Sequence, residues 1–216
     1  MMSLENCSLE SLNLFYEEGS VDGYGYEIIE TGFEISPEEF LKFAELDLTA
    51  EYKHHLVNSL SNTKRAIDSQ LDSLLIGFGL SEKSKRWRFP KKIEFLNSVG
   101  IISPRILNKI NKKRNLLEHE YKNPSKEEVE DALDVALLFV SYTNKYLNPA
   151  LVSCDLLTSG LDIKVDLDWK NCKLIFHVRQ QGKSKIDCID EEITVDQIEY
   201  NLYLAFFLSL YNYVNL

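Results

Sequence analysis

The sequence has little of what marks several large protein classes. Its four cysteines are scattered, with no Cys-x2-Cys pair and no histidine at ligand spacing, so neither a zinc site nor a disulfide framework is predicted. It also lacks a glycine-rich phosphate-binding loop, a His-Glu-x2-His motif and a Gly-x-Ser-x-Gly motif. We therefore expect no cofactor and no metal.

Long hydrophobic runs are missing as well. The most apolar stretch, residues 202–210, is far shorter than the roughly 20 residues of a membrane span. Glu5 and Glu10 stand near the N-terminus, where a secretory signal carries basic residues. The hydrophobic content of 44% and the charged content of 27% are those of an ordinary globular protein. Together these features predict a cytoplasmic protein that does not bind a membrane.

Positive charge is scarce except in one region. The formal net charge is −10, yet eleven of the 24 Lys and Arg residues lie between Lys83 and Arg114, beside a single acid, Glu94. Basic side chains attract a phosphate backbone, and Trp87 and Phe89 in the same region offer faces on which unpaired bases can stack. The alternative is a solvated surface in which the two aromatic side chains anchor the segment to the core. The residues that we expect to bind RNA are Lys85, Arg86, Arg88, Lys91, Lys92, Lys109, Lys112 and Lys113.

This basic region leads into a short motif with the side chains for phosphate chemistry. Its eight residues are Arg114, Asn115, Leu116, Leu117, Glu118, His119, Glu120 and Tyr121. Arginine offers a permanently charged planar fork to a phosphate, and histidine can exchange a proton near neutral pH. Ser103-Pro104 predicts a helix over residues 104–121. On a regular helix Arg114 and His119 lie roughly 140° apart. Either the helix bends, or a second copy of the chain supplies half of the site.

The motif Arg-x4-His-x-Tyr, between long amphipathic helices, resembles the HEPN domain family over about residues 49–147. The form found here is similar to that of HEPN toxins paired with a nucleotidyltransferase antitoxin. The resemblance implies a metal-independent endoribonuclease whose site is shared across a homodimer, with Tyr121 as the target of inactivating AMP transfer. It equally implies other roles of the family, in phage defence or as a non-catalytic module that binds RNA, a nucleotide or a protein partner.

For the catalytic reading, the residues have separate tasks. RNA can attack itself through the ribose 2′-hydroxyl, so the protein need supply only proton transfer and stabilisation of the added charge. We expect His119 to act as general acid or base, Arg114 to stabilise the charge and Asn115 to hold the phosphate or the imidazole. We expect Glu118 to steer Arg114, and Tyr121 either to support the site or to accept a modification. The expected products carry 2′,3′-cyclic phosphate and 5′-hydroxyl ends.

Hydrophobic periodicity and helix caps predict a mostly α protein. We expect an acidic N-terminal segment (1–35), with one strand in 24–35, then a HEPN-like antiparallel helical bundle (36–149), then a small C-terminal α/β elaboration (150–216). The expected helices are 36–45, 49–77, 90–100, 104–121 and 125–147. Alternating apolar residues predict a small antiparallel sheet from 161–169, 173–179 and 186–189, followed by a last helix that begins at Thr194. His177 alternates with apolar residues of its strand, which indicates a structural role.

Overall fold

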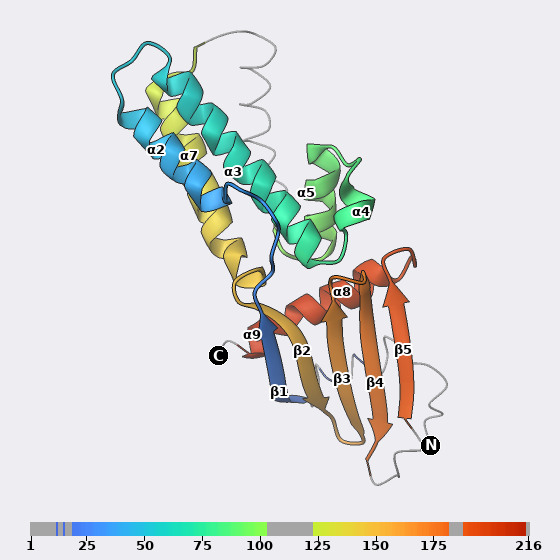
Figure 1. Ribbon diagram of the computed structural model, residues 1–216. Helices are drawn as coiled ribbons and strands as arrows, with labels where there is room; N and C mark the ends of the chain where they lie inside the picture. Colours follow the sequence, from blue (N-terminus) through green and yellow to red (C-terminus); the bar gives the residue numbers. More distant parts are fainter. Residues whose placement is uncertain (1–11, 13–14, 16–18, 103–122, 182–187, 215–216) are drawn as a thin grey trace.

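The computed structural model describes Leu12, Phe15 and residues 19–102, 123–181 and 188–214. The described helices between residues 37 and 143, which we call the helical layer, lie at one end of the molecule, and an antiparallel sheet lies at the other (Figure 1). One continuous core joins them. The expected motif helix, 104–121, lies outside the described residues.

The sheet is larger than expected. Its five strands run in the order β1-β2-β3-β4-β5, and each pairs antiparallel with the next. The strands are β1 (Ser20–Glu27), β2 (Ala150–Leu157), β3 (Leu161–Asp168), β4 (Lys173–Gln180) and β5 (Cys188–Thr194). The expectation of a mostly α bundle with a small sheet is therefore wrong, because this sheet dominates an α/β fold.

Strand β2 was not predicted from the sequence, and β1 begins before the strand expected in 24–35. β2 follows Pro149 as an apolar run without clean alternation, because the pairing with β1 skips Val152, so that Leu151 and Cys154, three residues apart, are both buried on one face. β1 contains two glycines and has register shifts on both sides of its centre, which weakens a period-two pattern. Pairing of β1 with β2 places residues from the N-terminal segment in the same sheet as the C-terminal strands.

The described helices are α2 (Pro37–Thr49), α3 (His55–Gly77), α4 (Ser81–Ser84), α5 (Phe89–Ser98), α7 (Lys126–Thr143), the 3-10 turn η1 (Asn144–Tyr146), α8 (Tyr200–Ser209) and α9 (Tyr211–Val214). The capping boxes predicted at Ser36 and Ser125 are present, with each serine hydroxyl accepting from the backbone N–H of a glutamate three residues on. The helix expected from Thr194 begins only at Tyr200, since Thr194 bonds Gln197 within a turn. None of the described helices is both long and apolar enough to cross a membrane.

The helix directions differ in part from those of the expected antiparallel bundle. The hydroxyl of Ser59 near the start of α3 donates to Ala44 O near the end of α2 at 2.7 Å, so these two helices are antiparallel. Helices α3 and α7 run in the same direction. Leu60 packs with Val129 at their beginnings, and Gln70 bonds Thr143 toward their ends.

One face of the sheet is buried beneath α8, whose Tyr203 ring packs edge-on against Phe176 at 5.3 Å. The phenol of Tyr200 donates to the carbonyl of Phe78 at 2.7 Å and so joins α8 to the end of α3. Burial raises the pKa of this phenol, which keeps it protonated as the donor. The helical layer and the sheet are thus held together through α8. The face of the sheet that is turned away from α8 is polar.

Candidate functional site

The residues expected to carry out catalysis lie outside the described part of the chain. These are Arg114, Asn115, Glu118, His119 and Tyr121, and the same holds for Lys109, Lys112 and Lys113 of the expected RNA-binding set. The described residues present two charged surfaces: the first half of the basic region, and a groove on the sheet that was not predicted from the sequence.

The basic segment, residues 83–92, begins in α4 and ends in the first turn of α5. Gly79 introduces it with a φ of 73°, a left-handed conformation that lets the chain turn sharply after α3. Arg88 is the N-cap of α5 in an extended conformation, and Pro90 stands in the first turn of that helix. Local chain geometry therefore places the backbone of the basic segment in the connection of α4 and α5, beside the end of α3 (Figure 1).

The aromatic side chains of the basic segment serve as anchors. Trp87 and Phe89 are half-buried and pack against the core, and the Trp87 ring lies 5.6 Å from that of Phe95. The ammonium of Lys91 lies over the Trp87 ring, 4.8 Å from its centre. Of the two readings left open by the sequence, anchoring describes these rings better than free platforms for base stacking.

The cations of the segment divide into paired and unpaired groups. Lys85 pairs with Glu82 at 2.6 Å, and Lys92 pairs with Asp72 of α3. Arg86 and Arg88 are exposed and make no hydrogen bond or ion pair with any described residue. Within the basic segment, these two guanidinium groups and Lys91 are the positive charges left to a phosphate backbone.

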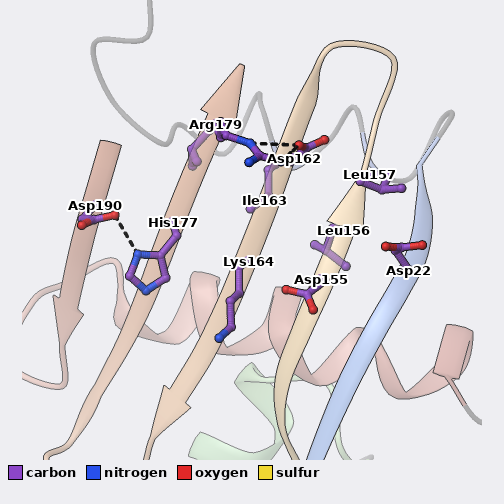
Figure 2. A pocket seen from close by; sticks show the side chains of 11 residues that line it. Asp22, Asp155, Leu156, Leu157, Asp162, Ile163, Lys164, His177, Arg179 and Asp190 are labelled. Carbon is purple, nitrogen blue, oxygen red and sulfur yellow. Dashed lines mark hydrogen bonds and ion pairs between the residues drawn. The ribbon is translucent and has the colours of Figure 1, made fainter. Parts of the chain in front are cut away.

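The second surface is a groove of about 650 Å³ on the outer face of the sheet, which we call the sheet groove. Figure 2 shows its charged side chains in front of the strands, with α8 behind them. The ionisable side chains that line it are Asp22, Asp155, Asp162, Lys164, His177, Arg179 and Asp190.

Within the sheet groove, cations and carboxylates form short pairs. His177 Nδ1 lies 2.7 Å from Asp190 Oδ1, and the guanidinium of Arg179 donates to Asp162 through Nε at 3.1 Å. The hydrogen bonds from Arg179, joined by one from Gln181, lower the pKa of Asp162. His177, expected to be structural, is therefore a half-exposed member of a charged surface. Alternation in β3 and β4 signalled the outward direction of these side chains, but their partners on β2 and β5 depend on strand register.

Other reactive groups are poorly placed for chemistry. Burial raises the pKa of the Cys154 thiol to about 11, which keeps the thiol protonated at neutral pH. A nucleophilic cysteine would need to be a thiolate. Among residues 19–102, 123–181 and 188–214, no cluster of His, Cys, Asp and Glu is arranged to hold a metal ion. The described residues thus offer two charged binding surfaces.

Comparison with protein-family models, with curated proteins and with solved structures finds no match to this chain.

Proposed function

We propose that this protein binds RNA and cleaves it as a metal-independent endoribonuclease of HEPN type, acting as a homodimer. The observation that carries the proposal is the pair of exposed guanidinium groups of Arg86 and Arg88, which pair with none of the described residues and stand on the segment that leads into the motif of Arg114 and His119. Arg105, Lys109, Lys112 and Lys113 come shortly before Arg114 in the sequence, so the proposed RNA strand would meet further positive charge beside the motif.

In the proposed reaction the ribose 2′-hydroxyl attacks the neighbouring phosphorus and the 5′-oxygen leaves. The imidazole of His119 acts as general base, which accepts the proton of the 2′-hydroxyl, or as general acid, which protonates the leaving 5′-oxygen. Arg114 stabilises the additional negative charge on the phosphorane. The nucleophile belongs to the RNA, so the reaction needs no metal-activated water. The products are a 2′,3′-cyclic phosphate and a 5′-hydroxyl.

Binding is tested by removing the two unpaired charges. The double variant Arg86→Gln/Arg88→Gln is compared with Lys42→Gln/Lys53→Gln, which loses the same charge from exposed positions near α2 and α3. Each phosphate contact to a single strand contributes about 0.7 to the slope of log affinity against log salt concentration, so losing two should lower the slope by about 1.4. The affinity difference between wild type and variant should then grow about 25-fold for every tenfold fall in salt concentration.

An equal loss of slope in both double variants would mean that the basic segment has no special part in binding. A loss confined to the arginine variant supports the surface assignment independently of any cleavage.

Cleavage is tested by incubating the purified protein with a single-stranded RNA in excess EDTA. Wild type should produce 2′,3′-cyclic phosphate ends, whereas Arg114→Ala and His119→Ala should lose cleavage and keep RNA binding within a few-fold. An alanine double variant that cleaves as fast as wild type would refute the mechanism. Binding without cleavage by wild type would leave a non-catalytic RNA-binding module.

We place this activity in the cytoplasm, in a toxin–antitoxin or phage-defence system. A nucleotidyltransferase partner would silence the nuclease by transferring AMP to Tyr121. Intact-mass measurement of the protein isolated with and without that partner tests this part: an AMP-sized increment that disappears in Tyr121→Phe supports it, and an unmodified protein from both sources contradicts it.

A further inference from the structure

The outer face of the sheet carries an ordered row of charged side chains across its strands. Asp155 of β2 is opposite Lys164 of β3, which is opposite His177 of β4, which is opposite Asp190 of β5. The row begins at Gly23 of β1, opposite Asp155. Because neighbouring strands fix this register, the face presents its charges at constant positions.

Negative charge exceeds positive charge on the described part of this face. Three basic side chains of this face each form an ion pair with a carboxylate: Lys164 with Asp166, Lys173 with Glu192, and Arg179 with Asp162. Asp190 is engaged by His177. The carboxylates left without a cation are Asp22, Asp155 and Asp168, of which the third accepts hydrogen bonds from Asn171 in its own turn.

Asp22 and Asp155 are therefore the uncompensated pair, and both line the sheet groove. A Cβ atom added to Gly23 would lie 2.8 Å from Asp155 Oδ2, so this carboxylate leans over the glycine toward β1. Asp22, beside Gly23 at a register shift of β1, presents its carboxylate at the same end of the groove (Figure 2). Neither carboxylate forms a hydrogen bond or ion pair with a described residue.

The matching positive surface lies on the opposite side of the sheet. Lys83 of the basic segment bonds the carbonyl of Val195 and lies 4.0 Å from Asp196, in the turn that leads to α8. Helix α8 covers the inner sheet face, and the sheet groove opens on the outer face. A molecule cannot bring Arg86 and Arg88 onto its own groove, because the sheet stands between them.

We propose that the sheet groove is a docking surface for the basic segment of a second copy of this chain. Arg86 and Arg88 of one copy pair there with Asp22 and Asp155 of the next. Both sides of the contact are uncompensated charges among the described residues, and long arginine side chains reach carboxylates without a change in the backbone. The contact joins two different surfaces, so it is head-to-tail and extends to further copies.

This contact would also regulate the nuclease, a consequence that rests on the proposed function. The guanidinium groups that hold RNA are the ones that dock, so a docked copy excludes RNA from the basic segment. Self-association is measured without RNA, and therefore its failure and the failure of the RNA proposal are separate results.

The test uses two charge-reversal variants of the full chain. The face variant is Asp22→Lys/Asp155→Lys, and the segment variant is Arg86→Glu/Arg88→Glu. Each one alone presents like charges on its two surfaces and should associate at least roughly tenfold more weakly than wild type at low salt. Their mixture restores complementary charges in two contacts: the basic segment of the face variant with the groove of the segment variant, and the reversed groove of the face variant with the reversed segment of the segment variant. The mixture should form complexes that contain both variants.

Sedimentation velocity at several concentrations measures the association, with circular dichroism to confirm folding. Glu45→Lys/Glu51→Lys is the matched control, since it changes the net charge as the face variant does but at exposed positions of the helical layer, and it should associate as wild type does. If the face variant does not fold, Asp22→Asn/Asp155→Asn replaces it and should weaken association without reversal.

The proposal is overturned if wild type shows no salt-sensitive association, if the control variant weakens as much as the face variant, or if the mixture associates no better than its components. A groove that binds an arginine-rich peptide while the wild-type chain does not self-associate would assign the surface to another basic partner and likewise overturn the second-copy proposal.

Discussion

The pairing of Gln70 with Thr143 provides a sharp test of how α3 and α7 are held together. The Gln70 amide donates to the Thr143 hydroxyl at 2.8 Å, and that hydroxyl donates to the carbonyl of Phe139 at 2.7 Å. Gln70 is 1% exposed and Thr143 is 0% exposed, so water cannot replace either partner. Thr143→Val keeps the shape and leaves the buried amide without an acceptor there, which costs about 1–3 kcal/mol.

The assay is urea unfolding, with thermal unfolding as a second measurement. For a chain of this length each kcal/mol should lower Tm by about 2–4 °C. Thr49→Val is the control, because the Thr49 hydroxyl bonds only carbonyls of its own helix at an exposed end and its loss should cost well under about 1 kcal/mol.

A second variant separates the lost acceptor from other effects of valine. Gln70→Met/Thr143→Val removes the amide as well as the hydroxyl, and replacing both partners by apolar groups is nearly neutral in principle. The double variant should therefore recover most of the stability that Thr143→Val loses. If Thr143→Val costs no more than Thr49→Val, or if the double variant is less stable still, the hydrogen bond does not hold these helices as argued.

Three further predictions concern a cap, a turn and an ion pair. Ser125→Ala removes the capping box of α7 and should lower the unfolding free energy by about 0.5–2 kcal/mol in urea melts; no change would show that the cap is dispensable. Gly79→Ala should destabilise the protein more than Gly100→Ala. Both glycines have a positive φ, which costs alanine about 1–2 kcal/mol, but a Cβ atom at Gly79 would also lie 3.0 Å from the backbone of Cys172. Equal losses of unfolding free energy in the two variants would contradict this packing argument. The pKa of Asp162 is lower in the folded protein, chiefly through Arg179, so its stabilisation is present above the unfolded pKa of about 3.9 and lost as pH falls through the folded value. Asp162→Asn should thus be less stable than wild type at pH 7, with a gap that narrows in acid; a gap that widens in acid would reverse the assigned sign.

The two charged surfaces have different proposed roles: the basic segment binds RNA, and the sheet groove binds the basic segment of a second copy. The basic segment lies in the helical layer, anchored through Trp87, and leads into the motif. The sheet groove lies on the far face of the sheet and carries carboxylates that repel RNA. In the two proposals, the surface for phosphate and the surface for cations lie apart, so that one copy would compete with RNA for the basic segment of another.

Local features of the sequence determined much of the secondary structure. The serines at 36 and 125, each followed three residues later by glutamate, start helices because the capping bonds join neighbours in the chain. Alternation set the outward and inward faces of β3 and β4 in the same local way. The concentration of positive charge before residue 114 and the Arg-x4-His-x-Tyr motif are likewise properties of the sequence itself, and the nuclease proposal rests on them.

Only the tertiary structure decided which distant segments meet. β1 pairs with β2 across more than a hundred residues, and this pairing makes a five-stranded sheet out of what alternation alone predicted as three strands. The same register puts Asp155, Lys164, His177 and Asp190 in one row, although each lies in a different strand. Strand pairing and side-chain burial depend on which apolar surfaces cover one another, and no spacing within a single segment encodes that choice. Burial against the core makes Trp87 an anchor, and strand register makes His177 part of the sheet groove.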